Sequence, residues 1–213
     1  MKRSKSGTEQ RIIEAATQLF SRQGFSGTST REIARLADVN ETSVFRYFRS
    51  KQDVFWAAIQ SRVERLHVSK ALQNGLNNSG HPEATIRLIV EFLVDIATYH
   101  RELIWLFIVG FLELRPGTER VYYRHLAPTF QAIADYLGRS VETGALRKLD
   151  PHLTAIAFTA TVLAHHGMHP LLKSTHTAYA NTSEAIAAYS HFWLSALSLI
   201  KPANEKLATR AAV

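Results

Sequence analysis

The sequence predicts an all-α protein of two unequal parts, a small N-terminal head of three helices joined by a long helix to a larger helical half. Apolar residues recur at the 3.6-residue helical period in almost every segment longer than ten residues. No segment alternates convincingly with the period of two that is typical of strands. The 213 residues are long for one compact domain and short for two large ones, which favours a small module fused to a larger one.

The N-terminal part contains four predicted helices. The first presents one apolar face and ends at Gly24, because glycine readily adopts the backbone conformation that closes a helix. After two short helices, Ser50 and Asp53 form a capping box that opens a long helix. The segment QNGLNNSGHPE, residues 73–83, is the clearest linker. The expected helices are 8–23, 30–37, 41–47 and 50–72.

The larger half contains five more predicted helices. Pro128 should kink the third of them, because proline lacks a backbone donor and crowds the preceding turn. Asp150 and Pro151 supply the N-cap and the first residue of the fourth helix. Asn181, with Glu184 three residues on, caps the last one. The expected ranges are 82–99, 101–114, 118–143, 151 to the segment HHGMHP, and 181–200.

Composition narrows the class of protein. Residues 1–51 hold ten Lys and Arg against five Asp and Glu, a net charge of +5, whereas the rest hold fifteen against thirteen, or +2. The chain has no cysteine, which excludes disulfides and thiolate metal sites. Its longest apolar stretch, LIWLFIVGFL, is shorter than the roughly 20 residues that a membrane span needs. We expect a cytoplasmic protein without a membrane partner.

Residues 30–48, TREIARLADVNETSVFRYF, have the pattern of a helix-turn-helix that reads DNA. A recognition helix is short, is held by a preceding helix, and offers polar side chains from its N-terminal half to base edges. Thr30 is expected to cap the first helix. The inward-facing residues are Ile33, Ala34, Ala37, Val39, Val44 and Phe48. The outward-facing polar residues at the start of the second helix are Asn40, Glu41, Thr42 and Ser43.

Residues 24–55, GFSGTSTREIARLADVNETSVFRYFRSKQDVF, resemble the head of the TetR family of bacterial transcriptional repressors. The family pattern runs from Gly-Phe through Thr-x-x-Ile-Ala, Ala-Gly-Val, an aromatic pair before a Phe, and Ser-Lys, and its spacing is intact here. Two positions depart from it. Asp38 stands at the usual Gly, in a turn that requires a left-handed backbone, which Asp tolerates better than most residues. Phe45 stands at the usual Tyr and cannot donate a hydrogen bond to phosphate.

The resemblance implies a double-stranded DNA operator as partner, with phosphate contacts from Thr30, Tyr47 and Lys51. It places base-edge or nearby contacts at Arg31, Asn40, Glu41, Thr42 and Ser43, and Phe45 can pack against a sugar. By their chemistry, Asn40 suits adenine and Glu41 suits cytosine. A carboxylate in a first helical turn is also explained by the helix dipole, so both interpretations of Glu41 stay open. Lys2, Arg3 and Lys5 form either an arm for the minor groove or a disordered tail.

The resemblance also implies two uses for the larger half, dimerisation and the sensing of a small, largely apolar effector. The last two helices carry small residues that permit close helix contact, namely Ala157, Ala160, Ala164, Ala187 and Ser190. They also carry larger apolar ones, Leu153, Ile156, Leu163, Ile186, Trp193, Leu194 and Leu197. Two such helices from each subunit would form the four-helix bundle of a homodimer, and ordinary core packing within one chain is the alternative.

Aromatic and histidine side chains of the middle helices are the candidates for the lining of an effector pocket. Aromatic residues at helical spacing are core residues by default, so part of this set should be core rather than lining. The candidates are Phe92, Tyr99, Trp105, Phe107, Phe111, His125, Phe130, Phe158 and His165.

Two other functions compete with a ligand-responsive repressor. One is a helical enzyme or metal-binding protein that uses His165, His166 and His169, or Glu113. The other is a DNA-binding regulator controlled by a protein partner. We expect no cofactor, no metal and no catalytic residues, because phosphate loops, nucleophile elbows and paired acidic motifs are absent from the sequence. The expected domains are 1–55 for DNA binding and 56–202 for regulation and dimerisation, followed by a disordered tail, 203–213.

Overall fold

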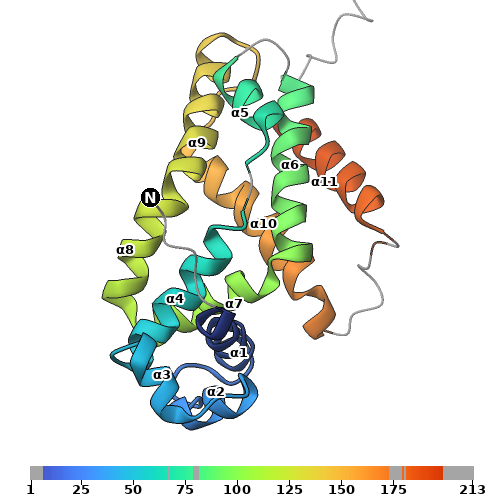
Figure 1. Cartoon of the computed structure of the whole chain (residues 1–213). Coiled ribbons are helices and arrows are strands. Elements are labelled where there is room, and N and C mark those ends of the chain that lie inside the picture. The colour runs from blue at the N-terminus through green and yellow to red at the C-terminus, as the bar shows by residue number, and fades with distance from the viewer. Residues whose placement is uncertain (1–6, 67, 79–81, 173–178, 180, 199–213) are drawn as a thin grey trace, which may run out of the picture.

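Figure 1 shows the computed structural model of the chain, in which residues 7–66, 68–78, 82–172, 179 and 181–198 are described. Within these ranges the regular structure is helical throughout, as the sequence predicts. The helices are α1 (Gly7–Gln23), α2 (Thr30–Leu36), α3 (Glu41–Tyr47), α4 (Lys51–Val63), α5 (Lys70–Asn77), α6 (Pro82–Tyr99), α7 (Arg101–Glu113), α8 (Arg115–His125), α9 (Ala127–Glu142), α10 (Pro151–Leu172) and α11 (Thr182–Leu197).

The helices α1, α2 and α3 form a head at one end of the molecule, with α4 leading away from it (Figure 1). Aromatic rings hold this head together: the centroid of Phe20 lies 5.7 Å from that of Phe25 and 5.1 Å from that of Phe55. The same buried apolar cluster extends into α7 through Leu103 and Leu106. The head therefore packs on α7 as well as on α4.

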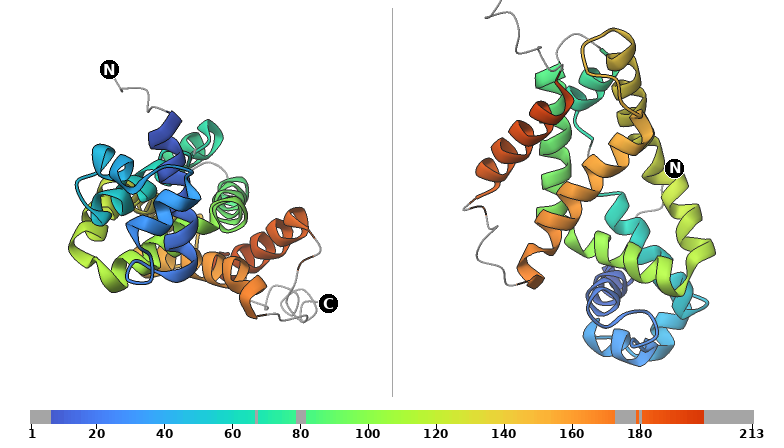
Figure 2. Two further views of the ribbon diagram at one scale, coloured as in Figure 1. Left: turned by 60° about the horizontal axis from the view of Figure 1, so that its bottom comes forward. Right: turned by 180° about the vertical axis from the view of Figure 1, so that it is seen from behind.

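The larger half has a second apolar core, contributed by α5, α6, α9, α10 and α11. Helix α6 packs against both α10 and α11, which lie together on the face seen from behind in Figure 2. Tyr136 is the largest fully buried side chain of this half, and the rings of Phe158 and Trp193 stack with centroids 4.5 Å apart.

The expected helix 50–72 is wrong in its second half. Ser50 does cap α4, accepting a hydrogen bond from the backbone N–H of Asp53, but the helix ends at Val63. A new helix, α5, begins after Ser69, whose hydroxyl accepts a hydrogen bond from the N–H of Leu72. It occupies part of the expected linker because its two leucines, Leu72 and Leu76, are four positions apart and both become buried.

The single kinked helix expected over 118–143 is also wrong, because the chain forms two helices, α8 and α9, that meet at Leu126. Pro128 lies in the first turn of α9, where the missing donor is unneeded, so the break precedes the proline. Helix α10 was expected to end at the segment HHGMHP, but it continues to Leu172. Near a helix end, Pro170 removes only one backbone hydrogen bond.

The caps expected for the last two helices are confirmed. The N–H of Leu153 donates to the Oδ1 atom of Asp150, and the N–H of Glu184 donates to that of Asn181, each over 2.9 Å. The expected tail, 203–213, and the basic residues Lys2, Arg3 and Lys5 lie outside the described residues.

Candidate nucleic-acid interface and ligand cavity

Helix α2 is fixed at its N-terminus by Ser29 and not by Thr30, which corrects the expected cap. The N–H of Glu32 donates to the Ser29 hydroxyl over 3.2 Å, and the N–H of Ser29 donates to the Glu32 carboxylate over 2.8 Å. This reciprocal pair is a capping box, and the spacing of Ser29 and Glu32 would have identified it in the sequence. Thr30 is thus the first residue of the helix.

The turn between α2 and α3 has the backbone expected for the family pattern. Asp38 has φ of +54°, which makes it the only residue other than glycine with a positive φ in the described part of the chain. Its carboxylate lies 3.8 Å from the guanidinium of Arg11, but both side chains are exposed, so this pair stabilises the turn little. The prediction of a left-handed turn without glycine is confirmed.

Helix α3 buries Val44 and presents its other side outward. Its residues Glu41, Thr42, Phe45 and Arg46 are exposed, and Phe45 keeps 50% of its surface accessible. The face that the sequence assigned to DNA is therefore accessible.

Three of the expected base-contacting residues, Asn40, Glu41 and Ser43, are held by internal hydrogen bonds. The Oδ1 atom of Asn40 accepts from both the N–H and the hydroxyl of Ser43, each over 2.7 Å, because Asn40 is the N-cap of α3. The hydroxyl of Thr30 donates to the Oε1 atom of Glu41 over 2.6 Å, which joins α2 to α3. Contacts of Asn40 and Glu41 with bases remain predictions, and one made through the Oδ1 atom of Asn40 would replace or share its bonds with Ser43.

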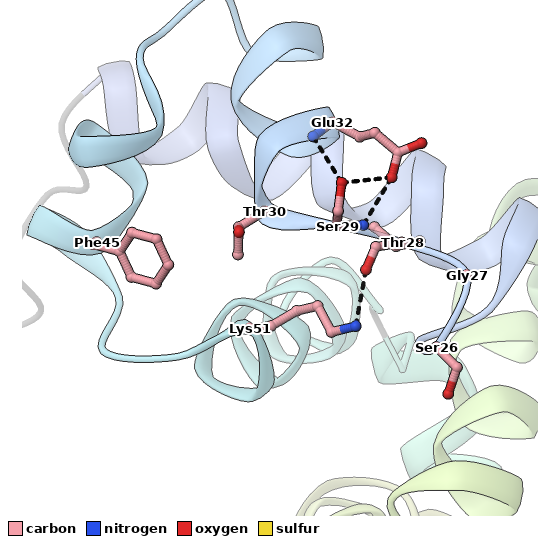
Figure 3. A pocket seen from close by; sticks show the side chains of 8 residues that line it. All are labelled: Ser26, Gly27, Thr28, Ser29, Thr30, Glu32, Phe45 and Lys51. Atoms are coloured by element: carbon pink, nitrogen blue, oxygen red, sulfur yellow. Dashed lines mark hydrogen bonds between the residues drawn. The ribbon is translucent and has the colours of Figure 1, made fainter.

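Two of the three expected phosphate contacts, Thr30 and Lys51, line a surface hollow beside the N-terminus of α2, shown in Figure 3. Thr30, Phe45 and Lys51 line it together with the loop 26–29. The ammonium of Lys51 donates to the carbonyls of Phe25 and Thr28, each over 2.9 Å, and lies 4.2 Å from the centroid of the Phe25 ring. An ammonium has three donors, so Lys51 holds this loop and keeps one donor for an anion.

The two remaining residues of the expected interface, Arg31 and Tyr47, do not line this hollow. Arg31 is exposed in the first turn of α2. Tyr47 is half-buried at the end of α3, where the guanidinium carbon of Arg46 lies 5.2 Å from the centroid of its ring. Arg46 is an exposed cation of α3 that the sequence reasoning missed, although the helical period already places it away from buried Val44.

A carboxylate of the larger half holds the loop that precedes α2. Glu113, at the end of α7, accepts hydrogen bonds from the N–H of Phe25 over 3.0 Å and from the N–H of Ser26 over 2.8 Å. The hydroxyl of Ser26 donates to the same carboxylate. Partial burial alone would raise the pKa of Glu113, but the Ser26 bonds outweigh it and hold the pKa below its usual value.

Buried Arg62 on α4 joins the head to α7 from a second side. Its guanidinium donates to Glu14 of α1 over 2.5 Å and to Glu102 of α7 over 3.0 Å. Arg65 donates to Glu14 as well. The hydrogen bond from Arg62 is the main reason why the pKa of Glu14 lies at about 2 instead of 4.5. Helix α7 therefore contacts the head through two polar connections and an apolar core.

The larger half contains an apolar cavity of about 600 Å³ that is bounded by α7, α8, α9 and α10. This volume lies in the range of sites for small organic molecules. Of the nine expected pocket residues, Phe107, Phe111 and Phe130 line it. Further lining residues that the sequence reasoning missed are Leu103, Ile104, Ile108, Tyr122, Tyr123 and Ile156. The four aliphatic residues of this set were missed because only aromatic and histidine side chains were considered, whereas Tyr122 and Tyr123 were missed because the sequence alone does not tell which aromatic residues face the cavity.

The other six expected pocket residues lie elsewhere. Trp105 lines an adjoining groove of about 200 Å³ between α7 and α10. Phe158 is fully buried against Trp193 in the core, and Phe92 packs at the edge of the same core. Tyr99 is 70% exposed, His125 is exposed, and the Nδ1 atom of His165 lies 2.5 Å from the Tyr189 hydroxyl.

The groups considered for an enzyme or a metal site are engaged separately. His165 contacts Tyr189, the Nε2 atom of His166 lies 3.1 Å from the hydroxyl oxygen of Thr98, and Glu113 holds the loop of the head. The side chain of His169 lies outside the described residues. Among the residues described, no three metal-ligating side chains come together. None of the helices described is both long and apolar enough to cross a bilayer.

The two helices expected to form a dimer interface divide into exposed and buried faces. On α10, Leu153 and Ile156 are 65% and 67% exposed, and the small residues Ala157, Ala160 and Ala164 continue the exposed stripe. On α11, Ala187 and Phe192 are exposed. By contrast, Ser190, Trp193 and Leu197 of the expected set are buried within the chain. Core packing within one chain, the alternative left open by the sequence, accounts for these three.

The fold and the geometry of α2 and α3 define an all-helical protein with a helix-turn-helix head. A family model described as "Bacterial regulatory proteins, tetR family" matches residues 12–58, and a model described as "AefR-like transcriptional repressor, C-terminal domain" matches residues 98–190. The chain belongs to the TetR family, whose members are transcriptional regulators and not enzymes.

Curated relatives agree with this assignment. The chain is 36% identical over 102 residues to the helix-turn-helix transcriptional regulator YttP of Bacillus subtilis, covering 46% of this chain and 48% of YttP. It is 30% identical over 98 residues to the transcriptional repressor NicS of Pseudomonas putida, covering 46% and 45%. These alignments span about half the length of each relative. Over nearly the whole chain, the ketosteroid transcriptional regulator KstR2 of Mycobacterium tuberculosis has the same fold, with a TM-score of 0.71, 14% identity, and coverage of 92% and 97%.

Proposed function

We propose that the protein is a homodimeric transcriptional repressor that binds a palindromic DNA operator and is released from it by a largely apolar small molecule. The observation that carries the proposal is the exposed polar start of α3, held at a fixed turn by α2 and flanked by the hollow that Thr30 and Lys51 line. This is the arrangement by which a helix-turn-helix presents its second helix to the major groove. Family membership and the repressor NicS support the sign of regulation.

Dimerisation is proposed through the exposed stripe of α10 and its neighbour α11. Exposed apolar side chains that lie in a row mark surfaces that another molecule covers, and a second copy of the chain presents the same row. The pairing would set two heads at a fixed separation, which a two-fold symmetric site requires. Residues 1–55 are proposed as the reading domain and residues 56–202 as the regulatory and dimerisation domain.

The effector is proposed to bind in the cavity of about 600 Å³ along α7. Glu113, the last residue of this helix, binds the loop before α2, so a shift of α7 on effector binding would move that loop. The effector would favour a separation of the heads that no longer fits adjacent major grooves. Such a shift of population requires that the effector bind one separation more tightly than the other.

Selection of duplexes from a random-sequence library by the purified full-length protein tests the proposal. We expect enrichment of a two-fold symmetric sequence whose half-sites lie about 10 base pairs apart or a multiple of this. Retardation of that duplex should be lost in the double variant Arg31→Ala, Arg46→Ala, while Arg120→Ala, exposed on α8, should bind as the wild type does. Failure of any sequence to be enriched over non-specific DNA would reject the proposed activity.

A further inference from the structure

The groove between α7 and α10 continues the cavity toward the start of α7. Four residues line both hollows, Ile104 and Ile108 from α7 and Ala160 and Leu163 from α10. The groove adds about 200 Å³ and ends beside Arg101, the first residue of α7. A ligand that occupies the cavity therefore has a path along α7 to this arginine.

Among the described residues that line either hollow, Arg101 is the only Lys, Arg, Asp or Glu. Its Nε atom is buried and makes no hydrogen bond within the described part of the chain. The carboxylate next to it in the chain, that of Glu102, accepts a hydrogen bond from Arg62 instead. A buried donor without an acceptor is uncommon in folded proteins and is explained where a ligand supplies the acceptor.

The spacing along α7 places this cation at one end of a continuous apolar wall. Arg101, Ile104, Ile108 and Phe111 follow one another at intervals of three, four and three residues, so they lie on one side of the helix. At 1.5 Å per residue, the ten steps from Arg101 to Phe111 extend over about 15 Å, roughly the length of an extended chain of twelve carbon atoms.

We propose that the effector is an amphipathic carboxylate, whose charged end binds Arg101 in the groove while its apolar body lies along α7 in the cavity. A planar carboxylate matches the fork of donors on a guanidinium. A single arginine in an otherwise uncharged lining suits one negative charge, whereas the phosphates of a nucleotide would require several cations. This inference rests on the proposed function, since it names the chemical class of the molecule that the cavity binds.

The test compares two probes with the same apolar body, decanoate and decan-1-ol, on the full-length protein at neutral pH. Both displace the neutral dye Nile red if the cavity binds apolar chains. We expect wild-type protein to bind decanoate at least tenfold more tightly than decan-1-ol. Arg101→Gln should abolish this preference and leave the affinity for decan-1-ol within a factor of two. Arg120→Gln, an exposed arginine on α8, should retain the wild-type preference.

The outcomes separate this inference from the proposed function. If Nile red binds but decanoate is not preferred over decan-1-ol, or if Arg101→Gln keeps the preference, the carboxylate class is rejected while the apolar cavity stands. If Nile red, decanoate and decan-1-ol all fail to bind, the cavity is not an effector site and both proposals are rejected. If the probes bind in the cavity, Thr159→Phe, which fills the cavity from α10, should reduce the binding of all three.

Discussion

The carboxylate of Glu113 binds the backbone of Ser26, 87 residues earlier in the chain, and so attaches the end of α7 to the loop that leads into α2. The same helix lines the cavity through Phe107 and Phe111. One rigid element thus contacts both the proposed effector and the proposed DNA-reading head. Removing the attachment should therefore affect the response to the effector more than the binding of DNA.

Glu113→Gln should weaken this attachment, because an amide has one acceptor oxygen where the carboxylate has two. We expect a loss of about 1 kcal/mol in the free energy of unfolding, the usual contribution of a hydrogen bond. Operator affinity in the absence of effector should change less than threefold. Release of the protein from DNA should require a higher concentration of effector. Glu142→Gln, at an exposed residue at the end of α9, is the matched control. Both variants are measured by urea denaturation and by titration of the DNA complex with effector. An unchanged effector response in Glu113→Gln would show that α7 does not act through this contact.

The pKa of Glu14 predicts how stability depends on pH. Because this pKa is about 2 in the folded chain and 4.5 otherwise, the stabilisation by Arg62 is fully present above pH 4.5 and is lost as pH falls from about 4.5 toward 2. Glu14 is partly exposed, so we expect a loss of about 1–2 kcal/mol rather than the full value. As pH falls through this range, the free energy of unfolding of Glu14→Gln should decrease less than that of the wild type. A wild-type curve and a variant curve with the same slope between pH 4.5 and 3 would contradict the assignment.

Asp38→Gly should stabilise the protein, because glycine adopts the positive φ of this turn without a steric cost. The gain should be about 1 kcal/mol in the free energy of unfolding. Asp38→Ala should be less stable than the wild type, since alanine has the same steric cost and lacks the polar side chain that makes the conformation tolerable. Denaturant midpoints of the three proteins give the order, and an alanine variant as stable as the glycine variant would exclude strain at this position.

Phe45→Tyr should increase operator affinity. The ring already lies at the edge of the hollow beside Thr30 and Lys51, and a hydroxyl would add one donor toward a phosphate (Figure 3). We expect a three- to tenfold lower Kd at fixed salt, corresponding to about 1 kcal/mol. Phe45→Leu, which keeps an apolar side chain without the ring, should bind more weakly than the wild type. Equal affinities for the phenylalanine and tyrosine forms would place residue 45 away from the DNA backbone.

Lys51→Ala should weaken operator binding and reduce the slope of log K against log salt concentration by about one. It should also loosen the loop that carries the carbonyls of Phe25 and Thr28, so its effect combines two causes. Lys51→Arg keeps the charge and serves as the control for the phosphate contact. A salt slope that stays the same in Lys51→Ala would mean that this lysine only holds the loop.

Local patterns predicted most of the fold. The caps Ser50, Asp150 and Asn181 were identified because a cap depends on residues only three positions apart. The left-handed turn at Asp38 was predicted from the family pattern. The breaks at Val63 and Leu126 were missed because apolar residues continue at helical spacing across both, and only packing with distant helices decides where each helix ends.

The candidate site could be predicted only where it is local. The outward face of α3 follows from the period of a single helix, so Phe45 and its neighbours were placed correctly at the surface. The cavity depends on how four helices cross, so the choice of aromatic residues included Phe158, which is core, and omitted Ile104, which lines the cavity. The bond from Glu113 to Ser26 joins two parts of the chain that no local pattern relates.

The three tryptophans of the chain fall in three different environments. Trp56 packs against the core of the head, Trp105 lines the groove beside the cavity, and Trp193 stacks on Phe158 in the core of the larger half. Variants that retain one tryptophan each would therefore carry an intrinsic fluorophore for the head, for the groove and for the larger half. The order in which these three regions lose their structure on heating could be followed without attaching a label.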